Sequence, residues 1–565
     1  MRIRKLLRVR FVVDPFTEQE KIMAELTPMM QKYMETKEQY KDCILFYRLG
    51  DFYEMFFDDA LVASKELEIT LTGKSCGLEE RAPMCGIPYH AVEGYLSKLV
   101  SRGYKVAICE QVEDPKLAKG LVKREVIRVV TPGTNLNVQS LEAGKNNYLL
   151  SIAYTPDGIG ISAADVTTGD YYVTEVEDLK KLNDELMKYE PSEIICNEAF
   201  LVSGFDVNDL KSRLHISVNA LESHMFDDDG CRRILMKHFK VNTLIGLGVE
   251  EFPTGLLAAG ALLQYLYDTQ KTDLEHFTHI YPYLTSKYML LDSSTRRNLE
   301  LTETLREKQK RGSLLWVLDK TKTAMGARLL RNYIEQPLIE KDEMEKRLDA
   351  IQELNQDSIS RDEIREYLNP IYDLERLLSK VTYKTANPRD LIAFRNSLQM
   401  LPPIKTVLSA FEKEELTKIR EQIDGLEDIY QLIDEAIIDE PPLSIREGGM
   451  IKDQFDETID RLRSAKHDGK QWLAQLEEED RERTGIKNLK IKYNKVFGYY
   501  FEVTNSYKNL VPEDYIRKQT LANAERYTTP RLKELEDTIL NAEDKLQTLE
   551  YDVFCRIRDT IAQEL

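Results

Sequence analysis

The sequence predicts a multidomain protein in which two mixed α/β domains precede a helical region that carries a small β-sheet on a long antiparallel arm. First, 565 residues are too many for one hydrophobic core. Second, strand and helix signals alternate in the first half of the chain, and strand signals fade after Leu284. Third, two heptad stripes flank a short alternating segment near the end. We therefore predict six segments. They are an unstructured extension (1–22), two α/β domains (23–131 and 132–283), a helical core (284–454), an arm with its sheet (455–530) and a returning helix (531–565).

The two α/β domains are predicted from short apolar runs that lie between helical stretches. In the first domain, the runs CILFY, KVAICEQ and VIRVV predict strands, and residues 91–103 predict a helix. The turn-rich TPGTNLN at 131–137 predicts a linker. In the second domain, YLLSIAY, GIGISAADV, YYVTEV and EIIC predict strands, and residues 178–188 predict a helix. Strands interleaved with helices favour mixed α/β domains.

The helical region is predicted from the spacing of its apolar residues. Steps of three and four residues mark a helical core stripe, formed by Ile364, Leu368, Ile371, Leu374, Leu378 and Val381. A heptad stripe follows at Phe455, Ile459, Leu462, Leu473 and Leu476, with Lys466 and Gly469 at its weak positions. A second stripe contains Leu532, Leu535, Ile539, Ala542, Leu546, Leu549 and Val553. Two such helices, separated by a long insertion, predict an antiparallel pair. Its outgoing arm, 455–483, would reach roughly 40 Å.

The insertion between the two stripes predicts a small sheet with one basic face. An apolar set alternates with a polar set, and these are Leu489, Ile491 and Tyr493 against Lys490, Lys492 and Asn494. Residues 494–498 predict a turn, and Tyr499, Phe501 and Val503 begin a return strand.

Positive charge is concentrated in this same segment. From Arg481 to Lys533 there are twelve Lys or Arg against five Asp or Glu, a net charge of +7 in a chain whose total is −19. A local basic island in an acidic protein indicates a placed electrostatic site. A lysine-rich solvated surface is the alternative. A charged grip at the end of a long arm suits a long, stiff, anionic partner, and duplex DNA fits that description.

Composition excludes several other classes of protein. The seven Cys include no C-x-x-C pair, so we expect buried free thiols, among them Cys43, Cys76, Cys85 and Cys109, rather than a zinc site. No segment approaches the roughly 18 consecutive apolar residues of a membrane helix. Arg residues interrupt the N-terminal MRIRKLLRVRFVV, which argues against a signal peptide, and we expect Met23 to be the true start.

The segment LFYRLGDFYEMFF at 45–57 strongly resembles the mismatch-reading motif of the bacterial MutS family. The family's other blocks follow in order: TPMMQKY, MCGIPYHAVEGYL, AICEQVEDP, RVVTPGT, LDSSTRRNLEL, TAMGARLLRNYIEQPL, DLERLLSKV, RERTGIKNLKIKYNKVFGYYFEV and RKQTLANAERYTTPRLKELE. The resemblance covers the chain from about Met23 to its end. It implies a mismatch-binding domain at 23–131, a connector with a ribonuclease-H-like fold at 132–283, a helical lever with the arm, and a β clamp at the arm tip.

The resemblance assigns mismatch reading to Phe52 and Glu54. Phe-x-Glu occurs three times in the chain, but only this copy lies in the GDFYEMFF frame. An apolar wedge in the minor groove unstacks a base step and kinks the duplex, and the penalty is smallest where pairing is already defective. Phe52 is the expected wedge. Glu54 is expected to hydrogen-bond the displaced base, either as a carboxylate that accepts a base N–H or in its protonated form. A core aromatic is the alternative for Phe52.

The resemblance also implies contacts to the DNA backbone from the clamp. Such contacts hold the duplex without specifying bases. The residues implied are Asn494, Lys495, Asn523 and Arg526, with Arg517 and Lys518 as further candidates.

The family's ATPase needs a phosphate loop. The near match Gly73-Lys74-Ser75 fails because the first glycine of the pattern would fall at Glu68. The second heptad stripe continues through Ile557 and Ile561 without a stop signal. We therefore expect the ATPase, with its ATP and Mg, to lie beyond Leu565, and we expect no catalytic residue, cofactor or metal in this chain.

The resemblance implies double-stranded DNA with mismatches or small insertion/deletion loops as the partner, together with MutL. It also implies a homodimer in the full-length family, no membrane association, and a cytoplasmic, nucleoid-associated location in a bacterium. Two alternatives stay open. One is a metal-dependent nuclease built on the second domain, with Asp157, Asp165 and Asp170 as candidate ligands. The other is a recombination-type MutS paralogue that binds DNA junctions.

Overall fold

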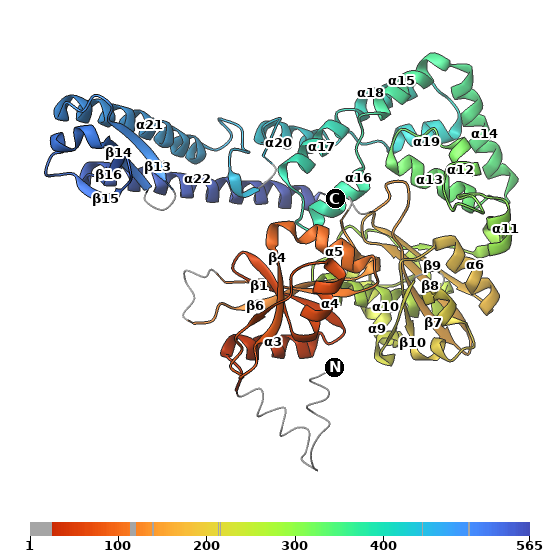
Figure 1. Cartoon of the computed structure of the whole chain (residues 1–565). Coiled ribbons are helices and arrows are strands. Elements are labelled where there is room, and N and C mark those ends of the chain that lie inside the picture. The colour runs from red at the N-terminus through yellow and green to blue at the C-terminus, as the bar shows by residue number, and fades with distance from the viewer. Residues whose placement is uncertain are drawn as a thin grey trace, which may run out of the picture. The chain divides into compact units, whose positions relative to one another are not determined.

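A computed structural model describes residues 25–113, 120–137, 141–212, 214, 216–442, 445–494 and 498–564 (Figure 1). The expected extension at 1–22 and the expected start at Met23 lie outside these residues. The chain forms two compact units. The first runs to Ser358 and includes Asp373–Tyr383 and Lys413–Glu415, and the second contains Ile359–Tyr372, Lys384–Glu412 and Leu416–Leu565.

The first α/β domain of the first unit is built on a mixed six-stranded sheet with the order β3-β4-β2-β1-β5-β6. Its strands are β1 (Cys43–Leu49), β2 (Phe52–Phe56), β3 (Thr72–Lys74), β4 (Ala82–Pro88), β5 (Lys105–Gln111) and β6 (Arg124–Val130). Only β1 and β5 pair in parallel. Helices α4 (Phe57–Leu67) and α5 (Val92–Val100) pack on one face, and α3 (Pro28–Gln39) packs on the other (Figure 1). The predicted mixed α/β domain is confirmed.

The second α/β domain also has a six-stranded sheet, with the order β11-β10-β7-β8-β9-β12. Its strands are β7 (Leu149–Thr155), β8 (Gly158–Asp165), β9 (Asp170–Val176), β10 (Glu193–Asn197), β11 (Ser217–Leu221) and β12 (Tyr281–Pro282). Strands β7, β8 and β9 form an antiparallel meander, and β10 pairs with β7 in parallel. Apolar cores on the two faces hold α6 (Leu179–Tyr189), α7 (Glu198–Leu201) and α8 (Val207–Ser212) on one side, and α9 (Asp228–His238) and α10 (Pro253–Gln270) on the other.

The rest of the first unit is helical. Its helices are α11 (Ser293–Asn298), α12 (Leu314–Leu318), α13 (Ala324–Glu335), α14 (Lys341–Gln356) and α16 (Leu374–Thr382). Arg328 of α13 is buried and joins α13 to the start of α16, because its guanidinium pairs with Asp373 at 2.7 Å and with Glu375 at 2.5 Å.

Within the described residues, five more helices precede the arm, and they show that the apolar stripe predicted over 364–381 is not one helix. They are α15 (Ser358–Leu368), α17 (Pro388–Leu398), α18 (Leu401–Leu408), α19 (Glu414–Gln422) and α20 (Glu427–Ala436). The predicted stripe is shared by α15 and α16, and the break contains Pro370. Proline has no N–H for the helix ladder and disfavours helical backbone in the residue before it. The apolar spacing was correct, but it does not belong to one helix.

The arm of the second unit is the predicted antiparallel pair, α21 (Glu457–Thr484) and α22 (Pro530–Gln563) (Figure 1). With 28 residues, α21 is about 42 Å long. The buried stripe residues are Ile459, Leu473, Leu476, Leu532, Ile539, Ala542, Leu546 and Val553. Gly469 is explained by packing, because a Cβ there would lie 2.5 Å from the Ile539 Cγ1 atom. The Lys466 side chain lies outside the described part of the chain.

The four-stranded antiparallel sheet between the arm helices has the order β13-β14-β16-β15. Its strands are β13 (Lys490–Asn494), β14 (Gly498–Thr504), β15 (Ile516–Thr520) and β16 (Ala524–Thr528). The predicted return strand is β14, and its residues Phe501 and Val503 are buried against both arm helices. Tyr493 departs from the predicted apolar face and is 50% exposed, because it lies on an edge strand and packs only its ring against Tyr499.

Candidate nucleic-acid interface

Phe52 is an exposed aromatic at the start of a strand. A tight turn precedes it, in which Gly50 has a φ of +58°. Phe52 opens β2 opposite Leu49 of β1 and Pro88 of β4. Its side chain is 46% exposed, whereas Phe46 and Phe56 from the same sequence run are at most 1% exposed. The alternative of a core aromatic at position 52 is therefore wrong.

The exposed face around Phe52 belongs to the side of the sheet that α3 covers only in part. Alternate residues of a strand point to the same side, so Phe52, Glu54 and Phe56 share this face. At Phe56 the face is closed by α3, since the rings of Phe56 and Tyr33 lie 4.9 Å apart. At Phe52 it is accessible.

Glu54 lies beside Phe52 and forms an ion pair. Its Oε2 atom accepts a hydrogen bond from Lys74 Nζ of β3 at 2.6 Å. The Glu54 side chain is 16% exposed and that of Lys74 is 35% exposed. The structure thus brings an exposed ring and a half-buried, paired carboxylate together on one face.

Gly86 of β4 leaves this face shallow. It pairs with Glu54 in the strand register. A Cβ built at Gly86 would lie 3.6 Å from Glu54 Cγ and 3.9 Å from Phe52 Cδ1. Any longer side chain at this position would therefore extend over the surface between the ring and the carboxylate.

The turn that carries Phe52 is braced by Arg48. Its Nε donates to the Gly50 carbonyl at 2.5 Å, and its guanidinium lies 3.8 Å from the ring centroid of Tyr89. Its Nη1 also pairs with Glu110 at 3.1 Å. The Tyr89 backbone N–H donates to the Asp51 carbonyl at 3.0 Å. These contacts give an exposed aromatic a rigid base.

The predicted clamp residues lie on or beside the small sheet of the second unit. Asn494 ends β13, Arg517 and Lys518 are on β15, Asn523 is in the turn before β16, and Arg526 is on β16, while Lys495 lies outside the described residues. Asn523 and Lys518 are exposed, and Lys518 sits at a β-bulge between Arg517 and Gln519.

The two clamp arginines are already engaged within the sheet. Arg526 donates to Gln519 Oε1 at 2.7 Å, and its guanidinium lies 4.5 Å from the Tyr500 ring centroid. Arg517 lies 3.6 Å from the buried carboxylate of Glu525. Both side chains therefore have structural partners that a DNA contact would have to share or replace.

The charges of the basic island are also partly neutralised. Lys492 pairs with Glu502 at 2.8 Å, and Lys508 pairs with Glu525 at 2.6 Å. The hydrogen bond from Lys508 holds the pKa of the Glu525 carboxyl below its usual range. Among the described residues of the island, the exposed lysines with no ion-pair partner are Lys487, Lys490 and Lys518.

The acids of the second domain do not form a metal site. Asp165 and Asp170 face each other in adjacent strands, and the Asn146 amide donates to both, at 3.0 and 2.8 Å. Asp157 lies at the opposite end of β8, so the three carboxylates do not converge. Within the described residues, no three His, Cys, Asp or Glu side chains are arranged to hold a metal ion. Nothing in this geometry favours the nuclease alternative.

Burial gives one acid of this pair an unusual pKa. It raises the pKa of Asp170 to about 6, and the neighbouring Asp165 carboxylate adds to the shift.

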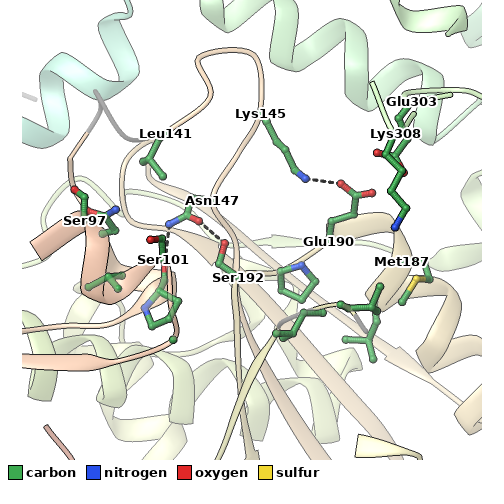
Figure 2. Close-up of a pocket in the computed structure, with 18 residues that line it drawn as sticks. Ser97, Ser101, Leu141, Lys145, Asn147, Met187, Glu190, Ser192, Glu303 and Lys308 are labelled. Atoms are coloured by element: carbon green, nitrogen blue, oxygen red, sulfur yellow. Dashed lines mark hydrogen bonds and ion pairs between the residues drawn. The ribbon is translucent and has the colours of Figure 1, made fainter. Parts of the chain in front are cut away.

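A cavity of about 540 Å³ with a mixed polar and apolar lining lies in the first unit, lined by α5, the linker after β6 and α6 (Figure 2). Figure 2 shows an ion pair between Lys145 and Glu190 and a hydrogen bond from Ser192 to Asn147. Each of these contacts is 2.5 Å long. These polar groups satisfy one another, and the cavity contains neither Phe52 nor Glu54.

The sequence also led us to expect buried free cysteines and no membrane-spanning helix. The described cysteines are all free, and Cys43, Cys76, Cys85 and Cys109 are buried as predicted. In the described ranges, each helix is too short or too polar to cross a membrane.

Arg48, Lys74 and Gly86 are residues of this surface that sequence reasoning missed. Lys74 was considered only as part of a phosphate loop, but it lies on strand β3 and its partner is a carboxylate. Its contact with Glu54 crosses 20 residues of sequence, and no local spacing pattern reports such a contact.

Comparison with known proteins covers almost the whole chain. Models of MutS domain I, MutS domain II and MutS domain III match residues 27–139, 147–278 and 294–565. Proteins named DNA mismatch repair protein MutS are similar over 96% of the chain. The one from Lachnoclostridium phytofermentans is 68% identical, that from Ruminiclostridium cellulolyticum 54%, and that from Acetivibrio thermocellus 53%. The chain spans 58% of the first relative's length and 62% of the other two.

Proposed function

The chain belongs to the MutS family, whose domains I, II and III it contains, and from this premise we propose that it binds mismatched double-stranded DNA. In this proposal Phe52 enters the minor groove and stacks on a mispaired base, and Glu54 hydrogen-bonds that base. The observation that carries the proposal is the exposed Phe52 ring beside a carboxylate, on a strand whose other phenylalanine is buried.

The energetics favour selection for damaged sites. Stacking a base on an aromatic ring contributes roughly 1–3 kcal/mol, which offsets much of a weakened base step and less of an intact one. The ring must be rigid for this difference to appear as binding preference. The bracing of the Phe52 turn by Arg48 and Tyr89 supports such rigidity.

The clamp would supply affinity that does not depend on sequence. We assign backbone contacts to Asn494, Lys495, Arg517, Lys518, Asn523 and Arg526, and the exposed Lys490 is a further cation on the same sheet. Contacts to phosphates position a duplex, whereas contacts to bases determine sequence specificity. Cations on the sheet of the arm suit the first of these roles.

Several expectations concern the complete family protein. The strand order of the second domain, a three-stranded meander followed by two parallel strands, supports a ribonuclease-H-like connector. ATP and Mg binding, recruitment of MutL, homodimerisation and sliding on DNA remain proposals that rest on the family. The presence of the Phe52–Glu54 pair argues against a paralogue that binds only junctions.

Fluorescence anisotropy with the 565-residue chain tests the proposal. Labelled duplexes with a G·T mismatch or an unpaired T are compared with a homoduplex at two salt concentrations. We expect Phe52→Ala to abolish the preference for the defective duplexes and to leave weak non-specific binding.

Leu61→Ala is the matched control, because Leu61 is 44% exposed and lies on α4 over the opposite face of the same sheet. It should retain the preference. Equal loss of binding to all duplexes in Phe52→Ala would contradict the assignment of the wedge.

A further inference from the structure

We infer that Lys74 is a positioning residue for Glu54: it fixes one carboxylate oxygen, leaves the other for the displaced base, and neutralises the carboxylate before phosphates approach. This inference rests on the proposed function of Phe52 and Glu54. It gives a role to the Gly73-Lys74-Ser75 segment, which does not form a phosphate loop.

The two oxygens of the Glu54 carboxylate have different surroundings. Lys74 Nζ binds Glu54 Oε2 at 2.6 Å. Within the described part of the chain, Glu54 has no other hydrogen-bond partner, so Oε1 is available to accept a base N–H. An unpaired carboxylate would be free to rotate, whereas this one is held in a single orientation.

Packing holds Lys74 in place from below. Thr72 of β3 and Phe56 of β2 both pair with Met84 of β4, the strand between them. Lys74 comes two residues after Thr72, and Phe56 is the last residue of β2, so Lys74 lies beyond the end of β2. Its side chain reaches back across Phe56, and its Nζ lies 5.5 Å from that ring's centroid. Phe56 is itself buried against Tyr33. The ammonium group is therefore placed by a cation–π contact as well as by the ion pair.

Electrostatics favour a paired carboxylate on a surface that meets DNA. A lone carboxylate is repelled by nearby phosphates, and it must either be paired or take up a proton before it enters a groove. With Lys74 present the pair carries no net charge. Without Lys74, the uncompensated negative charge of Glu54 should weaken binding close to the phosphates.

Among the described residues, the strand neighbours of Glu54 other than Lys74 supply no positive charge. From β1 it faces Tyr47, from β4 Gly86, and from β3 Lys74. Burial raises the pKa of Tyr47 to about 12, even though the Arg124 guanidinium lies 5.4 Å from its ring, so this phenol stays neutral between pH 6 and 8.

The experiment compares Lys74→Met and Lys74→Arg with the unaltered chain on mismatched and matched duplexes at pH 8. We expect Lys74→Met to reduce the mismatch preference roughly tenfold, the size of a lost charge-assisted hydrogen bond. Lys74→Arg keeps the positive charge and should retain most of the preference. In a Glu54→Gln background, Lys74→Met should have no additional effect on preference.

Lys65→Met serves as the control, since Lys65 is exposed on α4, which packs on the other face of the sheet. If Lys74 only touches a phosphate, Lys74→Met will weaken binding to both duplexes equally, and it will do so in the Glu54→Gln background as well. That result would overturn the inference and leave the proposed function intact. Retained preference in Phe52→Ala would instead contradict the proposed function itself.

Discussion

The small sheet at the arm offers a quantitative test of DNA binding, because only some of its cations are unneutralised. Lys490 and Lys518 are exposed and have no ion-pair partner among the described residues, whereas Lys492 and Lys508 are paired with Glu502 and Glu525. An unpaired lysine that contacts a phosphate releases a condensed counterion when DNA binds. Replacing it with glutamine removes that release without leaving a carboxylate uncovered.

The expected magnitude follows from the counterion relation. Each phosphate contact contributes about 0.9 to the slope of log K against log salt concentration, so Lys490→Gln with Lys518→Gln should flatten the slope by up to about 1.8. Between 50 and 200 mM salt, this difference changes the ratio of affinities of the two proteins by roughly 12-fold. The loss should be the same for mismatched and matched DNA, because phosphate contacts carry no base information.

The assay is a salt titration by fluorescence anisotropy on both duplexes. Lys65→Gln with Lys545→Gln is the matched control, since both lysines are exposed and belong to helices α4 and α22 rather than to a strand of the small sheet. An unchanged slope in Lys490→Gln with Lys518→Gln would refute the assignment of this sheet as the backbone grip. A loss confined to the mismatched duplex would refute it as well.

Two further predictions concern stability. Burial and Asp165 raise the pKa of Asp170 to about 6, so the folded state holds more protons than the unfolded state between about pH 4 and 6, and this group's contribution to stability falls as pH rises through that window. Asp170→Asn should therefore stabilise the protein by up to about 3 kcal/mol at pH 8 and by less at pH 5, measured by urea unfolding, and destabilisation at both pH values would contradict this account. At the arm, Gly469→Leu should cost about 1–3 kcal/mol, because its Cβ would lie 2.5 Å from Ile539 Cγ1, whereas Ser506→Leu at an exposed site should change the unfolding midpoint little. Equal unfolding midpoints for the two leucine variants would contradict this account, because they would mean that α21 and α22 can move apart at Gly469 at little cost.

Local pattern was sufficient to predict most secondary structure and the arm. The heptad residues Leu532 to Val553 lie on one helix because a 3,4 spacing places them on one stripe whatever the rest of the chain does. The stripe at 364–381 shows the limit of this reasoning, since apolar spacing persists across the break at Pro370. Motif comparison separated Phe52 from two other Phe-x-Glu pairs, which spacing alone could not do.

The tertiary structure decided which side chains meet and which are available. Exposure of Phe52 depends on where α3 stops covering its sheet, and the partner of Glu54 arrives from a strand two positions away in the sheet. Within the described part of the chain, Lys490 and Lys518 have no ion-pair partner, whereas Lys508 is paired with Glu525. The periodicity of apolar residues indicates which face of its own helix or strand each side chain occupies. Charge neutralisation and burial depend on contacts between elements distant in sequence, and only the folded chain creates those contacts.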